Sequence, residues 1–320
     1  MENINEIIRY ATLAPSGHNT QPWKFYLEKN QIKIFPDYSR RLPAVDPDDR
    51  ELFISLGCAL ENLLIVAEHN GYSTNVEYSF DGNGEDFISV VLDTDGIKEN
   101  DILYDAIPQR QTTRSKYDGN SIPDDDLDKL KSVIMEDGIS SLFITDDDKI
   151  EAIIDLVRMG NKIQMNDENF KKELTSWIRF NDSDTKKHLD GLSSKTMGSP
   201  SIPSWFGRFF IKYIATDKAQ SKKDEINIRS SSSLLVIMSD DNSKIAWVDI
   251  GRSFERLVLN ATALNIKNAH LNQPCEIPQL KEKLQEILSI GNKHPQLLLR
   301  IGYGQPLPRS QRRHVEDVVY

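Results

Sequence analysis

The chain has 320 residues, of which 38 % are hydrophobic and 28 % are charged, a balance that is typical of globular proteins with a sizeable buried core. Its formal net charge of −10 disfavours duplex DNA and anionic membranes as partners, but it leaves room for a local basic pocket. The acidic, polar N-terminus is unlike a secretory signal, and no run approaches the roughly 18 apolar residues of a membrane span. We therefore expect a cytoplasmic protein with no nucleic-acid and no membrane partner.

The two cysteines, Cys58 and Cys275, lie among apolar or small residues. No CxxC motif is present, and no histidine stands near either cysteine at the spacing of metal ligands. The sequence therefore predicts two reduced structural thiols, with neither a disulfide framework nor a metal site.

Hydrophobic periodicity predicts a short amphipathic helix over residues 4–13, which Pro15-Ser16-Gly17 ends. The elements expected next, in chain order, are strands at 24–27 and 31–35, a long buried helix at 52–69, and strands at 76–80 and 87–92.

A second series of elements begins near Asp101. We expect helices at 101–110 and 123–135, a strand at 141–145, helices at 147–160 and 170–179, a strand at 234–239, a long buried helix at 247–264, a helix at 278–288 and a strand at 297–303. Helices with sparse strands indicate the α+β class, since a doubly wound sheet alternates the two regularly.

Residues 181–230 differ from the rest, because they are rich in Ser, Lys, Asp, Gly and Pro and contain a cluster of aromatic residues. One interpretation is a partly helical insertion that forms a lid over a site. The other is a surface excursion whose aromatic side chains pack on the body of the protein. The aromatic residues are Trp205, Phe206, Phe209, Phe210 and Tyr213.

The two long buried helices resemble each other. Gly57 and Glu61 of the first correspond to Gly251 and Glu255 of the second at a constant offset of 251 − 57 = 194, and the apolar positions match. Chance similarity of two buried helices is the alternative. A true repeat predicts two copies of one α+β unit, over 1–100 and 101–320, that form an internal pseudo-dimer.

Three polar clusters are candidates for binding chemistry. The first runs from Pro15 to Trp23, where small residues allow a flat ligand to approach the backbone closely. The second, 110–114, and the third, 309–313, are basic. Guanidinium groups bind phosphate well, although ion pairing with surface carboxylates would also explain each basic cluster by itself.

The segment Pro15-Ser16-Gly17-His18-Asn19-Thr20-Gln21-Pro22-Trp23 resembles the Pro-Ser-x-x-Asn-x-Gln-Pro-Trp motif of the nitroreductase superfamily. Residues 110–114 resemble the family's Arg-x-Ser-x-Arg/Lys motif, with Thr112 in place of Ser. The tail from Pro295 to Arg313 is similar to the family's last strand and phosphate-binding end. Within the superfamily, the chain most resembles the Acg-related subgroup, whose members have about this length.

This resemblance implies an FMN site. It assigns Arg110, Thr112 and Arg114 to the phosphate and ribityl end, with added charge from Arg312 or Arg313. It places Pro15, Ser16, Gly17 and Asn19 at the isoalloxazine, and the loop Leu271-Asn272-Gln273 near the flavin N5, where a backbone N–H would donate. Two positions depart from the family: Gln111 stands where a second Arg is frequent, and Asn265 where Gly is expected.

The order of the motifs is reversed relative to ordinary nitroreductases, in which the phosphate motif comes first. Family members bind flavin at a dimer interface, where one subunit holds the phosphate and the other contacts the ring. A fused pair that kept one site would need one motif from each half, as this sequence has.

The resemblance implies an NAD(P)H-dependent flavin oxidoreductase with ping-pong hydride transfer to a small electron acceptor such as a nitroaromatic or a quinone. The flavin does the chemistry, so no side-chain nucleophile is required, and no Rossmann GxGxxG motif is present. The alternative is a non-catalytic protein that sequesters flavin beneath a lid. Either a monomeric pseudo-dimer or a homodimer is compatible with the sequence.

Overall fold

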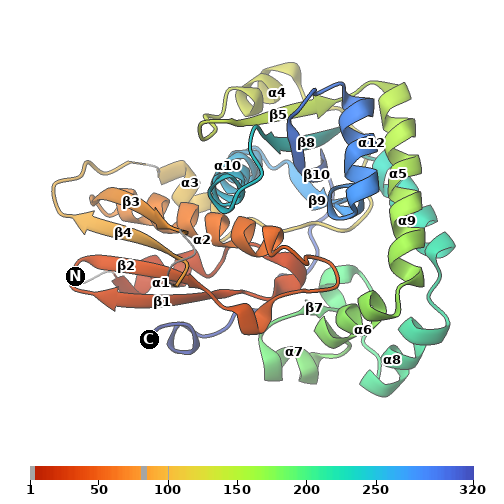
Figure 1. Cartoon of the computed structure of the whole chain (residues 1–320), viewed down its shortest axis with the longest axis horizontal. Helices are drawn as coiled ribbons and strands as arrows, with labels where there is room; N and C mark the ends of the chain where they lie inside the picture. The colour runs from red at the N-terminus through yellow and green to blue at the C-terminus, as the bar shows by residue number, and fades with distance from the viewer. Residues whose placement is uncertain (1–3, 81–84, 100) are drawn as a thin grey trace.

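The computed structural model describes residues 4–80, 85–99 and 101–320. Two four-stranded antiparallel sheets lie on either side of two long central helices (Figure 1). The α+β class predicted from the sequence is confirmed.

The first sheet has the strand order β1-β2-β4-β3. Its strands show apolar positions at every second residue, so one face of the sheet covers α2 and the other faces solvent. The elements of this part are α1 (Ile4–Ala11), β1 (Trp23–Glu28), β2 (Gln31–Pro36), α2 (Arg50–His69), β3 (Ser73–Ser79) and β4 (Phe87–Asp93).

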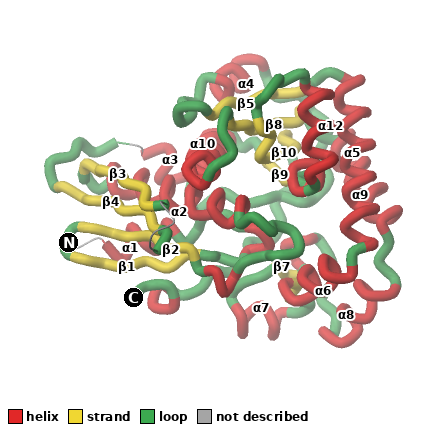
Figure 2. The backbone as a smooth tube through the Cα atoms, viewed as in Figure 1, coloured by secondary structure: helices red, strands yellow, loops and turns green. Residues whose placement is uncertain are grey.

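The second sheet has the order β5-β8-β10-β9. All seven residues of β8 are buried, because helices cover the face of this sheet that lies away from the centre (Figure 2). The elements are α3 (Asp101–Ala106), α4 (Asp124–Lys131), β5 (Ile139–Ile144), β8 (Ser233–Ser239), α10 (Lys244–Ala263), β9 (Lys267–His270), α11 (Gln273–Glu276), α12 (Pro278–Leu288) and β10 (His294–Gly302). The short β9 and α11 were not predicted.

The two sheets have the same connectivity. The strands β1, β2, β3 and β4 occupy the same places in their sheet as β5, β8, β9 and β10 in theirs, and every neighbouring pair is antiparallel. In each sheet the long helix precedes the last two strands in sequence. This agreement supports the proposed repeat, whose boundary at residue 100 lies outside the described residues.

The helices α2 and α10 meet where Gly57 lies against Gly251. A Cβ on Gly57 would stand 2.0 Å from the Val248 carbonyl oxygen, and a Cβ on Gly251 would stand 2.0 Å from that of Ile54. The two contacts are related by the same offset of 194 residues that relates the sequences. Only glycine permits this approach, so the contact explains why both helices carry Gly at the matched position.

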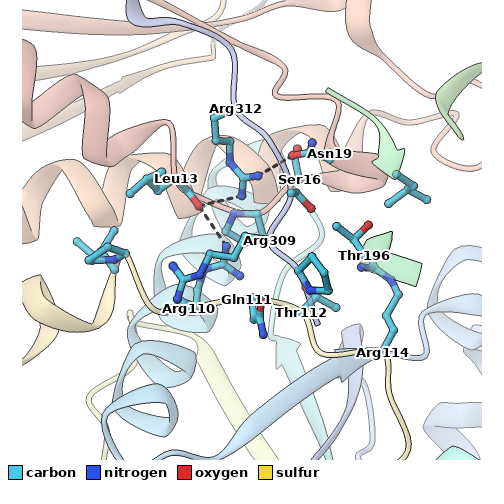
Figure 3. Close-up of a pocket in the computed structure, with 16 residues that line it drawn as sticks. Leu13, Ser16, Asn19, Arg110, Gln111, Thr112, Arg114, Thr196, Arg309 and Arg312 are labelled. Atoms are coloured by element: carbon cyan, nitrogen blue, oxygen red, sulfur yellow. Dashed lines mark hydrogen bonds between the residues drawn. The ribbon is translucent and has the colours of Figure 1, made fainter. Parts of the chain in front are cut away.

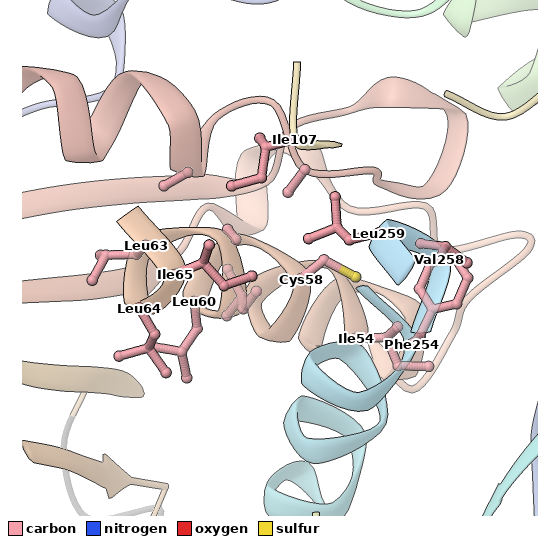
Figure 4. Packing of buried hydrophobic residues seen from close by; sticks show 14 of the residues in the cluster. Ile54, Cys58, Leu60, Leu63, Leu64, Ile65, Ile107, Phe254, Val258 and Leu259 are labelled. Atoms are coloured by element: carbon pink, nitrogen blue, oxygen red, sulfur yellow. The ribbon is translucent and has the colours of Figure 1, made fainter. Parts of the chain in front are cut away.

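Packing along these helices forms the main core (Figure 4), in which Cys58 and Phe254 lie together with Leu259. Both cysteines are free and buried, as predicted. Among the described residues, α2 is long and apolar enough to cross a membrane, but 89 % of its apolar window is buried in the protein. It is a core helix here.

An insertion separates β5 from β8, two strands whose counterparts β1 and β2 are joined by a two-residue turn. It begins well before residue 181, the limit that we expected from composition. It contains α5 (Asp147–Asn166), α6 (Glu168–Trp177), β6 (Ile178–Arg179), α7 (Asp182–His188), β7 (Leu192–Ser193), α8 (Ser204–Tyr213) and α9 (Asp217–Arg229).

Asn265, at the turn that follows α10, has φ +61°. This left-handed backbone conformation is the one that glycine adopts most easily, and asparagine tolerates it better than most residues. The departure from the expected Gly therefore preserves the turn.

Candidate active site

The turn after α1 holds an unusual backbone. His18, Asn19 and Gln21 all have positive φ, between +49° and +55°. Such conformations cost on the order of 1 kcal/mol or more for each non-glycine residue, and they gather at functional sites. Ser16 stabilises the turn, because its hydroxyl accepts a hydrogen bond from the Gln21 N–H at 2.9 Å.

Side chains of this turn bind the insertion. The Asn19 amide donates to the Gly191 carbonyl at 3.1 Å, and the Gln21 amide donates to the Leu189 carbonyl at 2.9 Å. Asp190, between these two carbonyls, forms ion pairs with Arg40 of the first half and Arg179 of the insertion. The segment 189–196 is thereby fixed over the turn.

The basic segment 110–114 is positioned by the edge of the second sheet. Thr112 forms a bridge with Asn268 of β9, and the Thr113 N–H donates to the Asn268 carbonyl at 2.8 Å. The C-terminal tail crosses from β10 to the edge of β1, where the Phe25 N–H donates to the Val318 carbonyl. The tail carries Arg309 and Arg312 to the same place.

Four arginines line one pocket between the halves (Figure 3), and two of them are bound to protein groups. Arg110 pairs with the buried Glu255 at 3.1 Å and donates to the Leu13 carbonyl. Arg312 donates to the carbonyls of Thr12, Leu13 and Ala14 at the end of α1, and to Asn19 Oδ1. These two arginines hold the pocket together.

The other two, Arg114 and Arg309, have no hydrogen-bonding or ion-pairing partner among the described residues. Burial and the positive charge of Arg300 lower the pKa of Arg114 to about 10. Burial and the charge of Arg110 also lower the pKa of Arg309. An anion would relieve this accumulation of positive charge, so these guanidinium groups are the ones available to a ligand.

A second cavity, of about 270 Å³, adjoins the basic pocket and shares Pro15, Ser16, Thr112, Arg114 and Leu192 with it. His18 and His270 line it, and burial together with the Arg114 charge lowers the pKa of each to about 4. Both rings are therefore neutral at physiological pH. Within residues 4–80, 85–99 and 101–320, no group hydrogen-bonds the buried atoms His18 Nε2, His270 Nδ1 and Gln273 Oε1.

The far end of this cavity is acidic, with Glu51 and Glu276 in its lining. Burial and the charge of Glu51 raise the pKa of Glu276 well above its ordinary value. Burial and Glu51 also raise the pKa of Asp46 to about 7. Since like charges disfavour double ionisation, Asp46 is partly protonated near neutral pH.

The structure brings most of the predicted site residues together. One or both cavities are lined by Pro15, Ser16, Gly17, Asn19, Arg110, Thr112, Arg114, Asn272, Gln273 and Arg312. Asn19, however, lies in the basic pocket beside Arg312, away from the cavity that was expected to receive the ring.

Two predicted residues lie outside both linings. The Leu271 side chain is buried in the core of the second half, and its N–H donates to the Leu298 carbonyl. Arg313 bonds Gln21 and the Asp317 carbonyl instead. Conversely, Arg309 belongs to the predicted basic cluster but was not assigned a role. The resemblance pointed to Arg312 or Arg313 instead, and the sequence does not show which guanidinium is bound internally.

The insertion supplies one wall of the larger cavity through Gln164, Phe170, Leu174 and Leu192. The elements that cover this cavity are therefore α5, α6 and β7. Most of them precede residues 181–230, where a lid was expected. The aromatic side chains of α8 line none of the described cavities, and their exposed fractions run from 40 % to 73 %.

No family model matches the sequence. The chain is 26 % identical over 330 residues to "Putative NAD(P)H nitroreductase acg" of Mycobacterium tuberculosis, with 99 % of this chain and 95 % of that protein covered. It is 25 % identical over 331 residues to "Putative NAD(P)H nitroreductase Rv3131" of the same organism, covering 99 % and 91 %. The chain therefore resembles Acg-like nitroreductases along its whole length.

Solved structures with some likeness include the FMN-dependent nitroreductase NfnB of Mycobacterium smegmatis in complex with NADPH, with 9 % identity, a TM-score of 0.45, and 68 % of this chain and 97 % of that chain covered. A nitroreductase with bound FMN from Bacteroides fragilis has 16 % identity and a TM-score of 0.42, and covers 68 % and 97 %.

Proposed function

We propose that the protein is an FMN-dependent oxidoreductase of the nitroreductase type, which takes electrons from NAD(P)H and passes them to a small electron acceptor such as a nitroaromatic or a quinone. The observation that carries this proposal is the pair of adjoining cavities between the halves. Two arginines of the first cavity and several buried polar atoms of the second have no hydrogen-bonding partner in the part of the chain that the structure describes. The full-length likeness to proteins named as NAD(P)H nitroreductases supports the same proposal.

The residues present suit a flavin mononucleotide. Arg114 and Arg309 would hold the phosphate, because a guanidinium binds phosphate oxygens in pairs and neither is used by the protein. Thr112 lies between them and offers a hydroxyl. Phe254 and Cys58 give the adjoining cavity an apolar wall, and His18, His270 and Gln273 offer polar atoms to the edge of a ring.

A bound flavin supplies the redox chemistry itself, so this chain has to bind, orient and shield it. His18 and His270 are neutral, so each can donate or accept a hydrogen bond without adding charge. Glu276 lines the cavity, and its raised pKa suits it as a proton source for a reduced acceptor.

Flavin sequestration is the second candidate, and the fixed insertion favours it. Asp190, Gly191 and Leu189 are bound to Arg40, Asn19 and Gln21, while Phe170 and Leu174 cover the larger cavity. A lid that stays closed would exclude nicotinamide from the ring.

Absorption spectroscopy separates the two candidates. Purified protein loaded with FMN is expected to be yellow, and anaerobic NADPH or NADH is expected to bleach the flavin absorption band at about 450 nm. A yellow protein that neither nucleotide bleaches would favour sequestration. Failure to take up FMN would refute both candidates.

A further inference from the structure

The helix α8 presents an apolar surface that nothing in the described chain covers. Five of its residues and the residue after it point outward on one side, with exposed fractions of 73 % for Trp205, 64 % for Tyr213 and 49 % for Phe209. Phe206, Phe210 and Ile214 complete this surface, with exposed fractions between 40 % and 48 %. We refer to Trp205, Phe206, Phe209, Phe210, Tyr213 and Ile214 as the apolar face of α8.

The opposite side of the helix attaches it to the protein. A Cβ on Gly207 would meet the Phe180 ring at 2.1 Å, and Ile211 is buried in a cluster with Phe180 and Ile178. Since 3.6 residues make a turn, a helix seated on Gly207 and Ile211 must direct the apolar face to solvent. The helix itself lies at the periphery of the protein, away from both sheets (Figure 1).

Basic residues border this face on one side. Between Lys195 and Lys223 the chain has six basic residues and a single acidic one, Asp217. Arg208 and Lys212 follow one edge of the face, and Lys218, Lys222 and Lys223 continue along α9. Of these five, none has an ion-pair partner among the described residues. The net charge of −10 for the whole chain therefore conceals a local surface of the opposite sign.

We propose that the apolar face of α8 docks on an anionic lipid surface. Aromatic residues, above all Trp and Tyr, favour the boundary between headgroups and acyl chains, and a helix with an aromatic face and flanking lysines lies in that boundary. Basic residues beside it are attracted to anionic headgroups. The global charge argument against membranes does not apply to this local surface.

A second copy of the chain is the less suitable occupant. A stable protein–protein interface employs about 20–30 residues from each partner, whereas the apolar face offers six. Its basic border would also repel the same border of a second copy related by two-fold symmetry. Lipid requires no such matching surface.

Vesicle flotation tests the proposal, with phosphatidylcholine vesicles compared with vesicles that contain about one third phosphatidylglycerol. The FMN-loaded, full-length protein is expected to bind the anionic vesicles at least about tenfold more strongly, and to lose that preference at high salt. Trp205 lies in the docking face, so tryptophan emission should shift to shorter wavelength on binding.

Phe209→Ser with Tyr213→Ser is expected to abolish binding and the emission shift while keeping Trp205 as the reporter. Arg208→Glu with Lys212→Glu should remove the preference for anionic vesicles. Ile134→Ser is the matched control, since Ile134 is 78 % exposed on a different part of the surface, and it should bind as the unaltered chain does. These three variants should retain the circular dichroism and the FMN content of the unaltered chain.

Three results would overturn the proposal: no binding to anionic vesicles, equal binding to neutral and anionic vesicles, or binding unaffected by the Phe209 and Tyr213 substitutions. Sedimentation that reveals self-association through this face, without vesicle binding, would identify a second copy as the occupant instead.

Discussion

At the scale of single residues, the basic pocket divides its arginines between two tasks. Arg110 and Arg312 are held by protein acceptors, whereas Arg114 and Arg309 have none among the described residues. The distinction decides which substitution is informative. Removing Arg110 would leave the buried Glu255, whose pKa burial raises to about 7, with only the charge of Arg312 to offset it, so stability is expected to fall. Lost flavin binding in that variant would therefore be ambiguous.

Arg114→Gln is the sharper test of the phosphate end. We expect FMN affinity to fall by about 10- to 100-fold, because a charge-assisted bond to phosphate is worth on the order of 1.5–3 kcal/mol. The melting temperature of the flavin-free protein should not fall, since an unpaired, buried charge is removed. Fluorescence quenching of FMN measures the affinity, and Arg313→Gln, outside the pocket, is the matched control. Equal losses in both variants would contradict the assignment.

The acidic end of the cavity predicts a pH dependence of stability. Burial raises the folded-state pKa of Glu276 above its ordinary value, so the folded state binds the proton more tightly than the unfolded state does. The contribution of this carboxyl group to the free energy of unfolding is then fully present below about pH 4.5, and it declines as the pH rises toward the raised pKa. Glu276→Gln should raise the melting temperature at pH 8 by on the order of 2 °C and leave it nearly unchanged at pH 5.

Thermal unfolding, followed by circular dichroism at pH 5 and at pH 8, measures the effect of Glu276→Gln on the melting temperature. Glu282→Gln, on the exposed side of α12, serves as the control. A gain of the same size at both pH values would mean that the Glu276 carboxyl is not the group responsible.

At the scale of elements, the crossing of α2 and α10 is set by two glycines. Gly57→Ala or Gly251→Ala would place a methyl group on a carbonyl oxygen of the facing helix, and each is expected to cost about 1–3 kcal/mol. Both substitutions force the same separation of the helices. The double variant should therefore cost less than the sum of the single ones. Urea denaturation measures the three free energies, and strict additivity would argue against a shared contact.

Asp190 is one of the residues that fasten the insertion to the first half. Asp190→Asn removes the charge that holds Arg40 and Arg179 together, so the segment 189–196 should open more often. We expect FMN to dissociate about tenfold faster from this variant, since breaking a buried charge pair acts chiefly on the off-rate. Stopped-flow fluorescence after mixing with a flavin scavenger measures the rate. Lys195→Gln, which removes the exposed pair with Asp182, should leave it unchanged.

At the scale of the whole molecule, the sequence predicted the regular elements well, because strong periodicity and turn residues mark them. The long helices, the hairpin strands and the last strand lie within a few residues of their expected bounds. The extent of the insertion was missed, since α5 and α6 have ordinary amphipathic patterns that composition cannot distinguish from the body. The short β9 has no pattern of its own and forms only because β10 offers an edge.

The site was predictable as a set of motifs but not in its internal contacts. Which arginine is free, and which residue faces the ring, depends on tertiary partners such as Glu255 for Arg110 and the end of α1 for Arg312. Neither partner adjoins its arginine in the sequence. Leu271 and Arg313 were assigned on family spacing, and their side chains are used elsewhere.

Both halves contribute to the two adjoining cavities that we propose as the flavin site. The repeat predicts an equivalent place on the other side of the two long helices, reached by adding 194 to the residue numbers. There Arg252 and Arg256 stand at the positions that correspond to Cys58 and Asn62. Both arginines form ion pairs with Glu61 and Glu136. Because these side chains pair with one another at this place, we expect the proposed pseudo-dimer to carry one flavin.

The stoichiometry of FMN binding tests this account most directly. Flavin-free protein titrated with FMN in a calorimeter is expected to bind one FMN per chain of 36.5 kDa, with the site lost or greatly weakened in Arg114→Gln. Two FMN per chain, or one FMN that Arg114→Gln binds as tightly as the unaltered protein does, would contradict a single site built from both halves.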